Sequence, residues 1–133
     1  MPLVVDSSAV LALLVGEPTA ADIAAELEAS DRNVMSAASL VETTIVAEAR
    51  FGPAGGSMVQ RVLREARVDV IEVTSQTALD AIDGWRTYGK GNHPAALNFG
   101  DCFTYALALR SGRRVVCTGA DFARTDLGVV PTI

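Results

Sequence analysis

Short runs rich in valine and other apolar residues alternate along this chain with longer stretches of helical periodicity. Strands are predicted at residues 2–6, 33–36, 69–73, 114–118 and 128–130, the last with the weakest signal. Helices are predicted between them, at 7–15, 18–30, 37–50, 56–67, 75–89 and 98–111. A helix is the usual crossover between parallel strands, so this alternation indicates a parallel arrangement. We expect an α/β fold with helices on both faces of a mostly parallel central sheet of four to five strands.

The 133 residues are expected to form one domain spanning 1–133. Half of the residues are hydrophobic, which is enough for a core and argues against long disorder. The N-terminus lacks the positive region of a signal peptide, and no uncharged apolar stretch approaches the ~20 residues that span a bilayer. Neither Cys102 nor Cys117 has metal-type spacing, and a disulfide scaffold would need more cysteines. We expect a soluble, cytoplasmic protein without a membrane segment.

The net charge of -5 argues against a protein that holds nucleic acid through bulk positive charge. It leaves a nucleic-acid enzyme open, because bound divalent metal ions would neutralise part of an acidic centre. Lys90 is the only lysine, and every other basic residue is arginine, whose planar fork suits phosphate. A codon bias toward arginine explains that composition equally well.

Four acidic residues stand in apolar surroundings. Asp6 and Asp121 each follow a predicted strand, so both should lie at the sheet edge where open α/β folds bind ligands. Glu42 shares a helix face with Ala38, Val41, Ile45 and Ala49, and we interpret this face as an inward, apolar stripe. Asp101 is the only charged residue between Lys90 and Arg110, near the start of a helix that is apolar nearly all round. Burial of that helix is expected.

An isolated buried carboxylate is costly, so acids in such surroundings need partners or a metal ion. Our central hypothesis is that the four acids form one cation site. Oxygen ligands of this kind suit Mg²⁺ or Mn²⁺, while the single histidine, His93, lies in a loop and argues against zinc. Ser8 and Thr118 place hydroxyls nearby that could orient a carboxylate or a water molecule.

Each acid also has a simpler interpretation. Asp6 can be a helix N-cap, Asp101 a cap after Gly100, and Asp121 the first residue of an Asx-turn. Glu42 is best explained otherwise by a buried ion pair with an arginine. These alternatives remain open for each residue alone, and the coincidence of four favours the shared site.

Four segments carry a resemblance to the PIN domain, and more narrowly to VapC toxins of bacterial type II toxin–antitoxin modules. They read Val-Val-Asp-Ser-Ser-Ala, Ser-Ala-Ala-Ser-Leu-Val-Glu-Thr, Leu-Asn-Phe-Gly-Asp-Cys-Phe-Thr-Tyr-Ala-Leu-Ala and Thr-Gly-Ala-Asp-Phe-Ala-Arg-Thr-Asp. The resemblance runs from Leu3 to Asp126, and the order and spacing of the segments make it specific. It implies a PIN-like α/β/α sandwich over the whole chain.

The resemblance also implies an endoribonuclease that depends on Mg²⁺ or Mn²⁺ and hydrolyses RNA phosphodiester bonds with metal-activated water. Its catalytic acids would be Asp6, Glu42, Asp101 and Asp121, of which Asp6, Asp101 and Asp121 would bind the metal. Ser8 and Thr118 match hydroxyls of the family. Close relatives often have two adjacent acids where this chain has Ala120 and Asp121. The fourth acid of the site is therefore expected to be Asp121, and Asp126 could take its place from the outer shell.

Substrate and partners follow from the same resemblance. RNA would be the substrate, and Arg86, Lys90 and Arg124 are candidate contacts, each with a solvated surface charge as the alternative. A cognate VapB-type antitoxin would restrain the enzyme. The apolar faces of helices 18–30 and 37–50 are expected to serve the antitoxin groove and a homodimer.

Two other classes of function compete with the nuclease. One is a catalytically silent PIN-like module that binds RNA or protein, which an absence of metal binding would support. The other is a phosphatase or phosphotransfer enzyme with a nucleophilic aspartate. Such enzymes often have a second aspartate two residues on, where this chain has Ser8, so that class is disfavoured.

Overall fold

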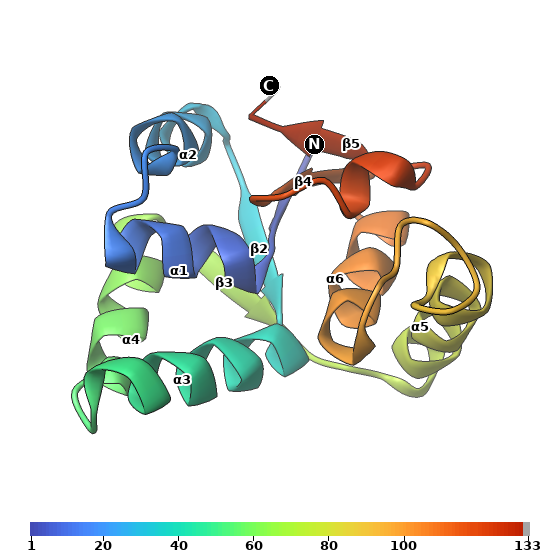
Figure 1. The fold of residues 1–133 in the computed structure, drawn as a ribbon. Coiled ribbons are helices and arrows are strands. Elements are labelled where there is room, and N and C mark those ends of the chain that lie inside the picture. The colour runs from blue at the N-terminus through green and yellow to red at the C-terminus, as the bar shows by residue number, and fades with distance from the viewer. Residues whose placement is uncertain (132–133) are drawn as a thin grey trace.

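The structure, a computed structural model, describes residues 1–131. Within these residues the chain forms five strands, six α-helices and one short 3-10 helix (Figure 1). In chain order they are β1 (Leu3–Val5), α1 (Ser7–Val15), α2 (Ala20–Ala29), β2 (Asn33–Ser36), α3 (Ala37–Phe51), α4 (Gly55–Glu65), β3 (Val68–Ile71), α5 (Ser75–Tyr88), α6 (Phe99–Arg110), β4 (Arg114–Val116), η1 (Phe122–Arg124) and β5 (Gly128–Val130). Every predicted strand and helix is present, with ends that differ by two residues at most.

All five strands are parallel, in the spatial order β3-β2-β1-β4-β5. The central strand β1 is paired with β2 on one side, where Val4 lies opposite Val34, and with β4 on the other, where Val4 lies opposite Val115. The chain therefore builds outward from β1 in both directions, which places a topological switch point between β1 and β4. Open α/β sheets bind ligands at the carboxyl ends of strands that flank such a point.

Helices cover both faces of the sheet, as the alternation predicts. Figure 1 shows α1 to α4 on one side and α5 with α6 on the other. Val4 belongs to the core under α5 and α6, whereas Leu3 and Val5 belong to the core under α1 to α4. Successive side chains of a strand point to opposite faces. Because both faces are covered, the central strand β1 is apolar throughout rather than alternating with polar residues.

The orientation of α3 corrects one expectation. Val41 and Ile45, assigned to an inward stripe, are 58% and 64% exposed, and Ala49 is exposed as well. The buried residues of α3 are instead Ser39, Thr43 and Ala47. Small and hydroxyl-bearing side chains let α3 approach its neighbours closely, and their hydroxyls find partners inside the protein. An apolar face of α3 is thus left at the surface.

The other helix expected to offer an apolar surface behaves differently. In α2 the large apolar residues Ile23 and Leu27 are buried in the core, and the outward face carries mainly alanine and acidic residues. The prediction of an outward apolar face is therefore wrong for α2 and correct for α3. Among the residues described, no helix combines the length and apolarity that crossing a membrane would require.

Candidate active site

Asp6 lies directly after β1, beside the switch point, and its side chain is only 5% exposed. One carboxylate oxygen, Oδ2, accepts bonds from the backbone N–H of Ser8 at 3.1 Å and the Ser8 hydroxyl at 2.7 Å. The other, Oδ1, accepts a bond from Oγ1 of Thr104 at 2.7 Å. Asp6 therefore caps α1, as its simpler interpretation expects. The bond from Thr104, in a distant helix, is not needed for capping.

Ser8 connects Asp6 to the neighbouring strand. Its Oγ donates to Asp6 and accepts the backbone N–H of Thr118, just beyond β4, at 3.1 Å. The contact that Thr118 makes is thus through its backbone. Among residues 1–131 the Thr118 hydroxyl makes no hydrogen bond, so its expected supporting role stays a prediction. The carboxyl ends of β1 and β4 are joined at the switch point through Ser8.

Glu42 lies in the second turn of α3 and is partly buried. Its Oε1 accepts a hydrogen bond from Oγ of Ser7 at 2.9 Å, which brings α3 against the start of α1. No lysine or arginine of the described chain forms an ion pair with Glu42. The alternative interpretation of this residue, a buried ion pair, is therefore not what the structure contains.

Asp101 is the third residue of α6 and forms a capping box with Asn98. Its Oδ2 accepts the Asn98 N–H at 3.0 Å, while its own N–H donates to Oδ1 of Asn98 at 2.9 Å. The pKa of Asp101 is raised to about 6, mainly by burial and to a smaller extent by the charges of Asp6, Asp121 and Glu42, while the bond from Asn98 opposes the shift. Mutual repulsion of this kind requires proximity. The structure thus gathers all four acids in one site.

Asp121 follows β4 through a short loop and precedes η1. Its side chain is exposed and makes no capping bond, so the predicted Asx-turn is not observed. The substitute considered for it, Asp126, faces a different environment: it pairs with Arg113 and accepts the hydroxyl of Tyr105 at 3.0 Å. Of the two aspartates, Asp121 is the one whose charge acts on Asp101.

The chemistry of this donor set fits a divalent cation. Its members are hard carboxylate oxygens, and the charges of Asp6, Asp121 and Glu42 add to the burial that raises the pKa of Asp101. Within residues 1–131, however, no three histidine, cysteine, aspartate or glutamate side chains converge closely enough to enclose an ion as they stand. Binding would require these carboxylates to draw together around the cation.

Several residues of the site were missed by reasoning from the sequence. They are Ser7, Ser39, Asn98, Gly100 and Thr104. Thr104 had a usable signal, because it lies three residues after Asp101 and residues at that spacing share a helix face. Ser7 and Ser39 looked like ordinary residues at helix starts, and only their long-range contacts distinguish them.

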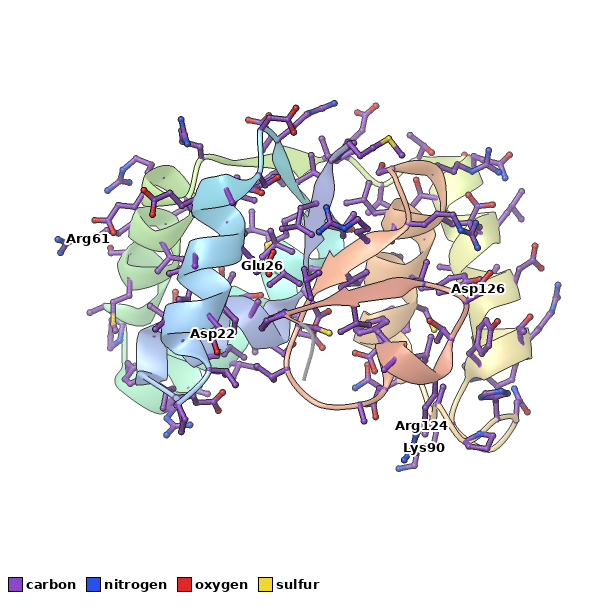
Figure 2. All side chains as sticks on the ribbon, turned by 90° about the horizontal axis from the view of Figure 1, so that it is seen from above. Asp22, Glu26, Arg61, Lys90, Arg124 and Asp126 are labelled. Carbon is purple, nitrogen blue, oxygen red and sulfur yellow. The ribbon has the colours of Figure 1, made fainter. Side chains whose placement is uncertain are left out.

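The candidate RNA contacts lie at different places. Arg86 forms an exposed pair with Asp83 on its own helix, α5. Lys90 is exposed in the loop that follows α5, and Arg124 in η1 donates to the carbonyl of Pro94 in the same loop at 3.1 Å. Figure 2 shows Lys90 and Arg124 projecting from one edge of the molecule. Two of the three basic residues therefore share a surface.

Comparison with known proteins was consistent across sequence and structure. The family model of the PIN domain matches residues 3–127. Ribonuclease VapC30 of Mycobacterium tuberculosis is 45% identical over 128 residues, which are 96% of this chain and 98% of the relative. The crystal structure of M. tuberculosis VapC20, described as a sarcin-ricin loop cleaving toxin, superposes with a TM-score of 0.76 at 18% identity, covering 94% and 95% of the two chains.

A complex also shares the fold. VapBC2 from Rickettsia felis, bound to a DNA fragment from its promoter, matches with a TM-score of 0.76 at 13% identity, and the match covers 97% of each chain. At such low sequence identity, both structural matches show similarity of the fold alone. The similarity to VapC30 extends over nearly the whole chain and includes the segments that carry the acids.

Proposed function

Because the chain belongs to the PIN-domain family and, within it, to the VapC ribonucleases, we propose that it is the endoribonuclease toxin of a type II toxin–antitoxin module. The observation that carries the proposal is the proximity of Asp6, Glu42 and Asp121 to Asp101 beside the switch point of the sheet. No basic side chain of the described residues forms an ion pair with any of them. We infer that a divalent cation is the partner of this cluster.

VapC ribonucleases are generally dependent on a divalent metal ion, and we propose Mg²⁺ or Mn²⁺ for this chain. Asp6, Asp101 and Asp121 would hold it, with Glu42 beside them. When bound, such a cation supplies Lewis acidity, which acidifies water and offsets the charge of the phosphodiester.

The chain's own residues have distinct tasks in this proposal. Three hydrogen bonds to its carboxylate fix the orientation of Asp6. Glu42, held through one oxygen by Ser7, keeps its other oxygen for orienting the attacking water. Asp101 has to lose its proton before it can bind a cation, and its pKa of about 6 places that step below neutral pH. Attack in line with the departing 3′ oxygen would leave 5′-phosphate and 3′-hydroxyl ends.

RNA is the proposed substrate, and Lys90 with Arg124 is the proposed contact surface. The protein as a whole is acidic, so attraction of RNA has to come from local positive charge. These two residues lie on one edge, whereas Arg86 is already paired with Asp83. Cleavage should therefore weaken with rising salt, and less steeply in a Lys90→Ala, Arg124→Ala double variant.

A VapB-type antitoxin is the proposed regulatory partner in the cytoplasm. Its cognate segment would be expected to carry a basic residue, because within residues 1–131 none of the four carboxylates is paired with a basic side chain. We assign the exposed apolar face of α3, formed by Val41, Ile45 and Ala49, to a homodimer. Large apolar side chains that cluster at a surface mark association sites.

The decisive test is cleavage of total cellular RNA by the purified, antitoxin-free protein with Mn²⁺ or Mg²⁺, followed by sequencing of new 5′ ends. Wild type should produce discrete 5′-phosphate ends that disappear with EDTA and in Asp6→Asn and Asp101→Asn. Asp22→Asn, at an exposed aspartate of α2, is the control and should cleave normally. Products with a 2′,3′-cyclic phosphate would refute the hydrolytic scheme. Folded protein that neither binds metal nor cleaves would instead be a silent binding module.

A further inference from the structure

A set of buried hydroxyls connects the elements that carry the acids. Oγ1 of Thr104 donates to Oδ1 of Asp6 at 2.7 Å and lies 3.2 Å from Oγ of Ser39. The backbone carbonyl of Ser39 accepts a bond from Oγ of Ser7 at 3.2 Å, and the same Ser7 hydroxyl lies 2.9 Å from Glu42. Thr104 is fully buried and Ser39 nearly so. The network thus runs from Asp6 to Glu42 through the interior.

The direction of the hydrogen bonds in this network follows from counting protons. An ionised carboxylate only accepts, so the single proton of the Thr104 hydroxyl is committed to Asp6. The contact between Ser39 and Thr104 can then be satisfied only if Ser39 donates. Hydrogen bonds arranged in series polarise one another, which strengthens the last bond, the one to Asp6. Asp6 is thereby oriented through Thr104 on one oxygen and through Ser8 on the other.

Thr104 also determines where Asp101 lies relative to Asp6. Asp101 and Thr104 are three residues apart in α6, so they lie one above the other on the same side of the helix. A bond from Thr104 to Asp6 therefore fixes α6 in height and rotation against the end of β1. Together with the core packing of α6, this contact constrains the separation of Asp6 and Asp101.

Ser39 extends the same effect to α3. Glu42 lies three residues after Ser39 in that helix, again on the same side. The hydroxyl of Ser39 contacts α6 through Thr104, and its carbonyl contacts the start of α1 through Ser7. The start of α1, which follows Asp6, therefore meets α3 and α6 around the buried residues Ser39 and Thr104. Glu42 lies in α3 and Asp101 in α6.

We propose that Thr104 is a positioning residue of the acidic site, which orients the carboxylate of Asp6 beside the helix that carries Asp101, so that both carboxylates can close on a divalent cation. The proposal rests on the proposed nuclease function but concerns the assembly of the site, not its substrate. Thr104 acts through Asp6 and does not itself touch the cation or RNA. Partners that orient metal ligands from outside typically change metal affinity or activity by about 10- to 100-fold when removed.

Thr104→Val tests the proposal, because valine has nearly the shape of threonine without the hydroxyl. Thr43→Val is the matched control: Thr43 is also fully buried, and its hydroxyl bonds to the Ser39 carbonyl at 2.6 Å without touching an acid. Calorimetric titration of the RNA-free protein with Mn²⁺ gives a readout that does not depend on cleavage. Thermal unfolding of each variant with EDTA gives the purely structural effect.

We expect Thr104→Val to bind Mn²⁺ about 10- to 100-fold more weakly, and to lower kcat rather than raise KM for RNA. Thr104→Ser, which restores the hydroxyl, should return to within about threefold of wild type. Thr43→Val should keep wild-type Mn²⁺ affinity although it loses a hydroxyl of equal burial. Ser39→Ala removes the donor to Thr104 and should weaken Mn²⁺ binding in the same direction, which keeps the test available if Thr104→Val fails to fold.

Wild-type Mn²⁺ affinity in Thr104→Val would overturn the proposal, and so would an equal loss in Thr43→Val, since that would show a structural effect only. The nuclease function is judged separately. If wild type binds Mn²⁺, Thr104→Val does not and no RNA is cleaved, the positioning role stands and the nuclease fails. If wild type binds no Mn²⁺, both fail.

Discussion

The carboxylate of Glu42 lies directly against Gly100: a Cβ at position 100 would be 2.6 Å from the Cδ of Glu42. This close approach joins α3 to the first turn of α6, one residue before Asp101. A glycine is required there by space and not by backbone conformation. The contact explains how Glu42 comes near enough to Asp101 to raise its pKa.

Gly100→Ala should impair the site while the fold survives. The overlap is with the end of a flexible side chain, so we expect the Glu42 carboxylate to move aside and its bond from Ser7 to be lost. Loss of one oriented group of this kind should lower RNA cleavage about 10-fold or more. Gly56→Ala is the control, because its Cβ would lie 2.6 Å from Oε2 of Glu48, a glutamate far from the acids. Comparable activity loss in both variants would contradict the assignment.

Asp121 and Asp126 should respond differently to the same substitution. Asp121→Asn removes a charge that acts on Asp101, so it should weaken Mn²⁺ binding and cleavage with little change in Tm. Asp126→Asn disturbs the pair with Arg113 and the bond from Tyr105, so it should lower stability by about 1 kcal/mol and leave Mn²⁺ affinity intact. Calorimetry and thermal unfolding of the two variants separate these effects. If Asp126→Asn weakened Mn²⁺ binding and Asp121→Asn did not, Asp126 would be the functional residue.

The metal-free protein should lose stability as Asp101 ionises. Its pKa is raised from 3.8 to about 6 by burial and by the neighbouring acids, so the folded state holds the proton more tightly than the unfolded state. The favourable contribution is complete below pH 3.8 and disappears as the pH rises through about 6. In EDTA, Asp101→Asn should therefore unfold at a higher temperature than wild type at pH 8, with the difference shrinking toward pH 4. A Tm difference that is constant over this range would contradict the pKa shift.

Ile45→Arg should dissociate the proposed homodimer. Ile45 is the most exposed large apolar residue of α3, and an arginine at the centre of an apolar interface would leave a charge without a partner. Light scattering or analytical ultracentrifugation should show a shift from dimer to monomer. Ala25→Arg, on the exposed side of α2, is the control and should stay dimeric. A wild-type protein that is monomeric at micromolar concentration would refute the assignment of this face.

The strands and helices could be predicted because their signals are local. Most strands are short runs rich in valine, and the helices between them show their own periodicity, so boundaries agree to within two residues. The same local order placed Asp6 and Asp121 after strands, and parallel topology then brings both to one edge of the sheet. The burial of α3 could not be predicted in this way. Its apolar side chains face outward, because hydroxyls from other elements satisfy the polar face within the core.

The sequence by itself determined the α/β alternation, the four acids and the family, since all of these are contained in residue types and their spacing. Only the tertiary structure decided which helix faces are buried, that Asp126 turns to Arg113, and that Thr104 holds Asp6. Asp6 and Thr104 are 98 positions apart in the chain. A contact over that separation depends on how the helices pack on the sheet, and local sequence patterns do not determine this packing.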